Sequence, residues 1–241
     1  MDDGSYAYSL TTFSPTGKLV QIEYALEAVN HGTTALGIKA TNGVVIATAK
    51  KNAPLIDETS IERISKISEN VGCVFSGLSP DYRVVVKKAR KEAEKYKLKF
   101  GEEASVLTIS TYIGSLMQDY TQAGGVRPMG CSLLVAGYNE ATKQPDLYQI
   151  DPSGSYWSWK ATGIGKDSQT TKQFLEKRYR ADSELDDAIH TAILTIKESY
   201  DGILTEKGID VGIVGIGEDG KMIHFKTLSE EEIKQYMQEN E

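Results

Sequence analysis

The chain is short of cysteine, of net positive charge and of long apolar runs, and each shortage excludes a class of protein. Its 241 residues include two cysteines, Cys73 and Cys131, each inside an apolar run. We therefore expect buried free thiols rather than a disulfide, which excludes a disulfide-stapled secreted domain. The net charge of -7 argues against a nucleic-acid partner. No run approaches the ~18 apolar residues that span a membrane.

The beginning of the chain also lacks a signal for export. Its first residues, Met-Asp-Asp-Gly, contain no basic region, so we expect no secretory signal and an intracellular protein. A chain of this length can bury roughly 70–75% of its unfolded surface, enough for one globular domain without staples.

Alternating and apolar segments predict strands in the first part of the chain. Asn42-Gly43 separates two β-rich runs, which is a strong hairpin signal. Ser79-Pro80 is typical of a helix start, with Ser79 at the N-cap. Strands are expected at 34–40, 44–49, 64–67 and 71–76, and long helices from 79 and around 106–120.

The second part of the chain repeats this order of strands and then helices. Strands are expected at 131–138, 147–150, 156–161, 211–216 and 222–226, and helices at 169–179 and 185–200. Ser229 and Glu232 form a capping box for a last helix. Blocks of strands followed by paired helices predict an α+β fold, a four-layer αββα sandwich of two stacked sheets between helix pairs.

The most specific segment runs from Thr12 to Ala25, where a Ser-Pro-Thr-Gly turn leads into a helix. Pro15 presets the turn, Gly17 relieves it, and Leu19, Ile22, Leu26 and Val29 recur on one helix face. The segment resembles the N-terminal signature of proteasome α-type subunits, roughly Phe-Ser-Pro-x-Gly-x-Leu-x-Gln-x-Glu-Tyr-Ala. The resemblance covers essentially the whole chain. It implies the N-terminal-nucleophile hydrolase fold with an extra N-terminal helix, divided into a gate tail at 1–12, a helix at 18–31 and a sandwich at 33–241.

The same resemblance frames the question of catalysis at Gly32-Thr33-Thr34. Catalytic β-type subunits expose a threonine after propeptide cleavage, and its free amine serves as the base. In β-type subunits an acidic residue follows sixteen positions later, and that position here is Ala49. We therefore expect no catalytic residues and a non-catalytic subunit. The alternatives are a β-type threonine protease with a propeptide ending at Gly32, and a stand-alone hydrolase of the same fold.

The resemblance implies that the N-terminal tail helps to close an axial pore. The family's gate cluster of Tyr, Asp, Pro and Tyr corresponds to Tyr6, Ala7, Pro15 and Tyr24, so the Asp is missing. The usual Tyr-Asp-Arg becomes Tyr6-Ala7-Tyr8, which implies an asymmetric contribution to the gate. The segment Ala123, Gly124, Gly125 and Val126 matches the annulus of the pore, where small residues let several backbones converge.

The resemblance further implies a pocket between neighbouring α subunits that receives the C-terminal carboxylate of an activator. Arg63 replaces the family's usual lysine and keeps the charge, while Leu19, Gly32, Gly77 and Leu78 match the walls. The implied partners are six other α subunits in a seven-membered ring, the β ring, activator tails and unfolded substrates in transit. The implied location is the cytoplasm and nucleus.

Other motifs favour structure over chemistry. The glycines between Gly215 and Gly220 match a dinucleotide motif, but the expected following element is a strand rather than a helix, so we interpret them as a hairpin turn. His31, His190 and His224 share no metal-ligand spacing. We expect no metal and no cofactor.

Overall fold

The structure is a computed structural model that describes residues 11–50, 55–57, 60–200, 202–217 and 219–238. The predicted gate residues Tyr6, Ala7 and Tyr8 lie outside the described residues. No helix in the described part of the chain is long and apolar enough to cross a membrane.

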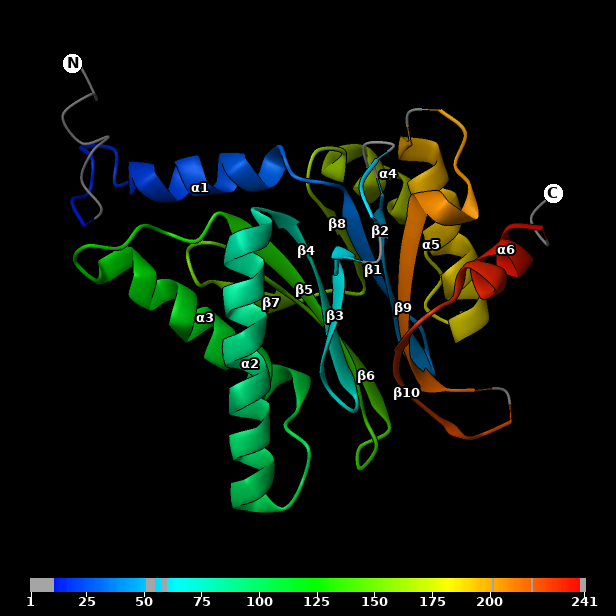
Figure 1. The fold of residues 1–241 in the computed structure, drawn as a ribbon. Coiled ribbons are helices and arrows are strands. Elements are labelled where there is room, and N and C mark those ends of the chain that lie inside the picture. Colours follow the sequence, from blue (N-terminus) through cyan, green and yellow to red (C-terminus); the bar gives the residue numbers. More distant parts are fainter. Residues whose placement is uncertain (1–10, 51–54, 58–59, 201, 218, 239–241) are drawn as a thin grey trace.

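Two antiparallel sheets form the centre of the described structure (Figure 1). The first has the order β10 (Met222–Thr227), β9 (Ile209–Ile216), β2 (Gly43–Ala49), β1 (Ala35–Lys39) and β8 (Ala161–Ile164). The second has the order β3 (Ile64–Ser68), β4 (Val71–Gly77), β5 (Cys131–Asn139), β6 (Gln144–Ile150) and β7 (Tyr156–Ser158).

Helices cover the outer face of each sheet (Figure 1). The helices α2 (Ser79–Phe100) and α3 (Val106–Gln122) lie on the second sheet. The helices α4 (Ser168–Arg178), α5 (Leu185–Ser199) and α6 (Glu230–Gln238) lie on the first, and the 3-10 turn η3 (Glu206–Gly208) precedes β9. The helix α1 (Val20–Asn30) projects across one end of the sandwich and contacts β4 and β5.

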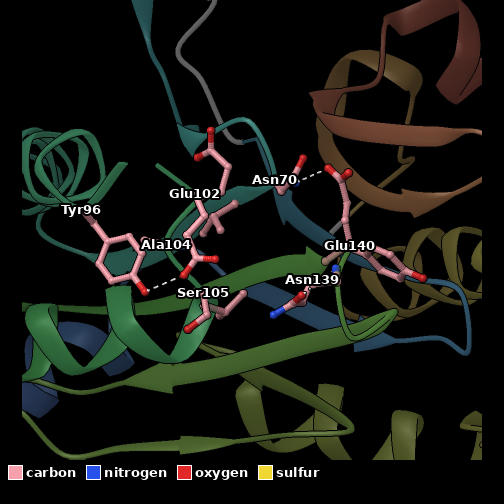
Figure 2. Close-up of a pocket in the computed structure, with 12 residues that line it drawn as sticks. Asn70, Tyr96, Glu102, Ala104, Ser105, Asn139 and Glu140 are labelled. Atoms are coloured by element: carbon pink, nitrogen blue, oxygen red, sulfur yellow. Dashed lines mark hydrogen bonds between the residues drawn. The ribbon is translucent and has the colours of Figure 1, made fainter. Parts of the chain in front are cut away.

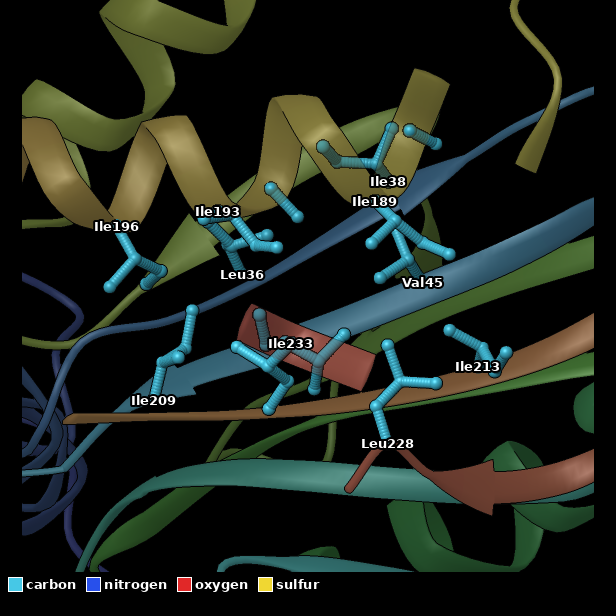
Figure 3. Close-up of a cluster of buried hydrophobic side chains, with 14 of the residues drawn as sticks. Leu36, Ile38, Val45, Ile189, Ile193, Ile196, Ile209, Ile213, Leu228 and Ile233 are labelled. Atoms are coloured by element: carbon cyan, nitrogen blue, oxygen red, sulfur yellow. The ribbon is translucent and has the colours of Figure 1, made fainter. Parts of the chain in front are cut away.

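Three clusters of buried apolar side chains hold the two sheets and the two helix layers together. One lies between the first sheet and its helices (Figure 3), and Leu36 and Val45 of the sheet meet Ile193 of α5 there. A second joins α2 and α3 to the other sheet, and a third, containing Ile46 and Leu134, lies between the sheets. An amphipathic helix and a sheet each have to bury one apolar face, and this stacking does so. The predicted αββα sandwich is therefore confirmed.

The two sheets approach closely at Gly72 on β4. A Cβ atom there would lie 2.0 Å from the Phe225 ring of β10, so only glycine fits between the sheets at this point. Phe225 is 4% exposed. The ring occupies the space that a side chain at residue 72 would need.

Most predicted elements are confirmed, with two corrections. The predicted strand 156–161 is wrong as a single element, because β7 pairs with β6 in one sheet and β8 pairs with β1 in the other. The chain crosses between the sheets at Trp159 and Lys160. The N-cap of α2 is Leu78 rather than Ser79, which is the first helical residue, and no side chain caps the end.

Several local predictions are confirmed by hydrogen bonds and pairing. Asn42-Gly43 joins β1 to β2, and Ser229 and Glu232 bond each other's backbone N–H groups, as a capping box requires. The glycine motif from Gly215 leads into β10, a strand. Cys73 and Cys131 are free and buried. Burial raises the pKa of each thiol to about 12, which keeps both protonated and unreactive.

Candidate functional site

The Ser-Pro-Thr-Gly turn before α1 is held by its own first residue. The Gly17 N–H donates to the Ser14 carbonyl at 2.9 Å, and the Lys18 N–H donates to Ser14 Oγ at 3.1 Å. Gly17 has φ +78°, which glycine adopts at little cost. Ser14 is 5% exposed, whereas Pro15 is exposed. The buried serine therefore fixes the turn and leaves the proline ring outside.

The described part of the chain covers the helix α1 only in part. Val29 and Ala25 are buried, whereas Leu19, Ile22 and Leu26 of the predicted apolar face are half-buried. Tyr24 is 55% exposed and Phe13, just before the turn, is 64% exposed. Two predicted gate residues, Pro15 and Tyr24, thus belong to one exposed unit of turn and helix. The aromatic side chains of Phe13 and Tyr24 are exposed to solvent in the described structure.

The threonine of the β-type alternative, Thr33, lacks the acidic residue expected sixteen positions later. Thr33 is exposed and lines a recess of about 160 Å³ together with Ala49, an apolar residue at the position of the β-type acid. The neighbouring carboxylate, Asp167, accepts a hydrogen bond from Thr34 Oγ1 at 2.9 Å. The Gly32 carbonyl also accepts a hydrogen bond from the Lys166 N–H at 3.0 Å, which holds the two backbone segments side by side.

Three of the predicted pocket residues meet where α1 ends. Gly32 lies against Gly77 so closely that a Cβ at Gly32 would come 2.2 Å from the Gly77 nitrogen. The Leu78 N–H donates to the Gly130 carbonyl at 2.8 Å, and its side chain is 43% exposed. The predicted wall residue Leu19 lies at the opposite end of α1, about 16 Å away along an eleven-residue helix.

The predicted cation Arg63 lies at the same end of the second sheet. It directly precedes β3, and Ile64 pairs with Val74 of β4, the strand that ends at Gly77. The Arg63 guanidinium lies 3.9 Å from an Asp210 carboxylate oxygen, and Lys50 Nζ lies 2.9 Å from the other oxygen. The Arg63 side chain is 12% exposed. Asp210 is a partner that sequence patterns did not indicate, because it is remote in the chain.

The predicted annulus residues form an exposed tip after α3. Ala123 is the C-cap, and Ala123, Gly124 and Gly125 are exposed while Val126 is half-buried. A Cβ at Gly124 or Gly125 would meet no atom within 4 Å. The small residues are therefore not required by packing within this chain, which leaves the tip free to approach other chains.

An ion pair that the sequence did not reveal ties this tip to α2. Arg127 donates to both carboxylate oxygens of Asp81, at 2.6 and 3.0 Å, and the Gly130 N–H donates to the same carboxylate at 2.9 Å. Burial alone would raise the pKa of Asp81, but these hydrogen bonds and the Arg127 charge hold it below the usual 3.8. Asp81 is thus ionised at neutral pH and fixes the base of the tip.

A cavity of about 290 Å³, lined by both polar and apolar groups, lies at the far end of α2 (Figure 2). Its polar groups bond to one another, since Tyr96 Oη donates to Glu102 at 3.3 Å and Asn70 Nδ2 donates to Glu140 at 2.6 Å. The cavity joins the α2–α3 corner to the β5–β6 turn. Among the described residues no group of three His, Cys, Asp or Glu side chains could hold a metal ion.

The fold, together with Ala49 at the position of the β-type acid, defines the class of protein to which the chain belongs. Two five-stranded antiparallel sheets between helix layers, preceded by an extra N-terminal helix, are the architecture of proteasome subunits with the N-terminal-nucleophile hydrolase fold. The family profile of the proteasome subunit matches residues 29–214. A second profile, for the N-terminal signature of A-type proteasome subunits, matches residues 6–28.

Similar proteins agree over the full length of the chain. The proteasome alpha type-2 subunit of Oryza sativa subsp. indica is 53% identical over 242 residues, covering 100% of both chains. The alpha type-2 subunit of Dictyostelium discoideum is 53% identical over 235 residues, covering 98% of each. The probable alpha type-2 subunit of Neurospora crassa is 52% identical over 244 residues, covering 96% of this chain and 97% of its own.

The chain belongs to the proteasome subunit family, and within it to the α type. It is a subunit of the 20S core particle, and it is 53% identical to alpha type-2 subunits over nearly their full length. The α-type signature argues against the catalytic β type, and α-type subunits are non-catalytic members of the threonine protease complex. Membership of this family implies assembly with other proteasome subunits.

Proposed function

We propose that this subunit takes one place in a seven-membered α ring, where it docks activator tails and helps to gate the pore. The chain acts as one α-type domain, in which residues 1–12 supply a gate segment and the sandwich supplies the ring contacts. Its partners are six other α subunits, the β ring, activator tails and unfolded substrates in transit. It works in the cytoplasm and nucleus.

The observation that carries this proposal is the group of residues where α1 ends. Gly32, Gly77 and Leu78 meet there, and Arg63 lies at the same end of the sheet. The three wall residues offer small and apolar surface, and the guanidinium supplies a cation that can bind a carboxylate in two-point geometry. Leu19 lies at the other end of α1. This placement suits a pocket that two adjacent subunits complete.

Gating and pore lining rest on other exposed parts of the described chain. Pro15 and Tyr24 offer exposed contacts for a tail segment, and the tip from Ala123 to Val126 offers backbone that other chains can approach closely. Tyr6 and Tyr8 would be the tail's own contributions. Since Ala7 replaces the family's Asp, this tail contributes to the gate unequally with its neighbours.

Carboxylate docking can be tested with Arg63→Gln in assembled 20S particles. The probe is a synthetic activator C-terminal tail peptide, compared with the same peptide ending in an amide. Removing one charge-assisted contact of roughly 1.5–3 kcal/mol should weaken binding of the free-acid peptide by about ten- to a hundredfold. Arg63→Glu should weaken it further by repulsion. Arg63→Lys should restore much of the affinity.

The matched control is Arg180→Gln, which removes an exposed arginine paired with Asp182 elsewhere on the surface. It should leave tail binding unchanged. Surface plasmon resonance measures both affinities. If Arg63→Gln binds the free-acid peptide as tightly as the wild type does, or loses affinity for the acid and the amide equally, carboxylate docking at Arg63 is refuted.

A further inference from the structure

A recess of about 230 Å³ lies where the chain crosses between the sheets, beside α4. Its apolar walls are Trp159 from the crossing, Ala161 at the start of β8, and Leu175 and Tyr179 from the end of α4. Trp159, Ala161 and Tyr179 are half-buried, so these walls are open to solvent in the described structure. Small-molecule sites typically measure roughly 300–1,000 Å³, whereas this smaller recess suits one bulky side chain of a larger partner.

Contacts within the chain hold the Trp159 ring in one orientation. Its Nε1 donates to Gln149 Oε1 of β6 at 2.9 Å, and the Trp157 ring of β7 meets it edge-on with centroids 6.5 Å apart. Part of the Trp159 ring packs against the apolar cluster between the sheets. The opposite wall is fixed as well, because α4 packs against β8, the edge strand of the first sheet (Figure 1). The recess is therefore formed before a ligand arrives, which lowers the cost of binding.

Three charged residues line the recess itself, and two of them are lysines. Lys172 Nζ of α4 lies over the Trp159 ring, 5.5 Å from its centroid, and Lys160 is exposed at the crossing. Neither lysine forms an ion pair within the described part of the chain. The third charged residue, Glu176, is exposed one helical turn after Lys172. The lining therefore carries a net positive charge beside an aromatic wall, although the whole chain has a net charge of -7.

We propose that this recess docks a short acidic segment of a partner protein that binds the assembled particle. One aromatic or branched apolar side chain of that segment lies against Trp159 and Leu175, and flanking aspartates or glutamates bind Lys160 and Lys172. The unpaired lysines specify the charge of the occupant, and the apolar walls specify its anchor. The site shares no residue with the activator pocket or the gate, so it stands or fails separately from those roles.

The test is photo-crosslinking to intact 20S particles whose catalytic threonines are blocked by a covalent inhibitor. The probe is the peptide Asp-Glu-Phe-Glu-Asp with a diazirine acyl group at its N-terminus and an amide at its C-terminus, so that it has no terminal carboxylate for the activator pocket. A charge-only probe carries Ser in place of Phe, and a reversed probe carries Lys in place of every acid. Mass spectrometry should locate crosslinks of the first probe in residues 157–161 and 172–179, and labelling should fall as salt rises.

Matched variants separate the recess from general attraction. Lys160→Glu reverses an exposed charge of the lining and should lower labelling roughly tenfold, whereas Lys160→Arg should retain it. Lys177→Glu makes the same change at an exposed residue of α4 that does not line the recess, and it should leave labelling unchanged. Equal labelling by the charge-only or reversed probe, or equal losses from the two Glu variants, would overturn the proposal. Intact particles that stay unlabelled in this region, because a neighbouring subunit covers it, would overturn it too.

Discussion

The two adjacent threonines Thr33 and Thr34 differ in their surroundings, and neither difference makes Thr33 a nucleophile. Thr33 is exposed and its nitrogen is an ordinary peptide nitrogen, whereas Thr34 is 5% exposed and bonds Asp167 in both directions. A threonine nucleophile needs a free amine or another base beside its hydroxyl. The Thr34 hydroxyl is the one that bonds a carboxylate. Its hydrogen bond to Asp167 joins the residue before β1 to the start of α4.

We predict opposite outcomes for Thr33→Ala and Thr34→Ala. Thr33→Ala should leave every peptidase activity of an assembled particle unchanged, because the residue supplies no catalytic group. Thr34→Ala should lower the free energy of unfolding of the full chain by about 1–2 kcal/mol, since it removes a hydrogen bond to the half-buried Asp167 carboxylate. Peptidase assays with three specificity substrates and chemical denaturation measure the two effects. Loss of one specificity class with Thr33→Ala would contradict the α assignment.

At the scale of elements, the clamp between Asp81 and Arg127 joins the start of α2 to the exposed tip at residues 123–126. Its geometry is bidentate, and the Gly130 N–H adds a third bond to the same carboxylate. Ion pairs that are largely exposed contribute little, but the Asp81 side chain is 14% exposed and three hydrogen bonds fix its orientation. The tip's exposed glycines are therefore anchored on both sides, at their junction with residues 127–130 and at the end of α3, where the Ala123 N–H donates to the Asp119 carbonyl at 2.9 Å.

This clamp predicts a specific acid sensitivity. The pKa of Asp81 is lower in the folded chain than its usual 3.8, so the stability it adds is present above the unfolded pKa and is lost as pH falls through the folded pKa. Asp81→Asn should reduce the free energy of unfolding by roughly 1 kcal/mol at pH 7. The difference from the wild type should shrink below about pH 3.8. Denaturation at several pH values measures it.

The control is Asp119→Asn, which neutralises an exposed carboxylate on α3 that makes no side-chain hydrogen bond among the described contacts. Its effect should be within about 0.5 kcal/mol at every pH. A wild-type advantage over Asp81→Asn that stays constant far below the usual pKa of 3.8 would show that the Asp81 carboxylate does not titrate with the clamp.

Local signals predicted most elements, and remote contacts account for the errors. The Asn42-Gly43 hairpin, the turn at Pro15 and the capping box at Ser229 each depend on residues a few positions apart, so sequence sufficed. The sequence did not predict that the chain crosses between the sheets at Trp159. A run of β-forming residues has the same pattern whether it forms one strand or two strands in different sheets. The pairing of Arg63 with Asp210 was equally hidden, since the partners lie on different sheets.

At the scale of the whole particle, the tail before the turn can be separated from the helix after it. Deleting residues 1–12 should raise basal hydrolysis of small peptides, because one plug segment is removed. The turn at Ser14 and the helix α1 retain their own contacts, so assembly should survive. Deletion through Asn30 should abolish assembly, because it removes the buried Val29 and the half-buried Leu26. An activator-saturated particle sets the upper limit of the rate.

The two deletions distinguish gating from folding. Peptidase rates are compared for particles that native mass spectrometry shows to be complete. A basal rate for the short deletion equal to the wild-type rate, and well below the activator-saturated rate, would show that this tail does not hold the pore closed. Normal assembly after the long deletion would show that α1 is dispensable for ring contacts.

The partial coverage of α1 has a consequence for the chain before it meets its partners. Phe13, Tyr24 and Leu78 leave apolar surface exposed in the described part of the chain. Any neighbour that covers it stabilises the folded form by mass action, so the melting temperature should depend on protein concentration and on the supply of the other subunits. A copy made in excess of its partners keeps this surface in water, so we expect it to unfold at a lower temperature than an assembled copy.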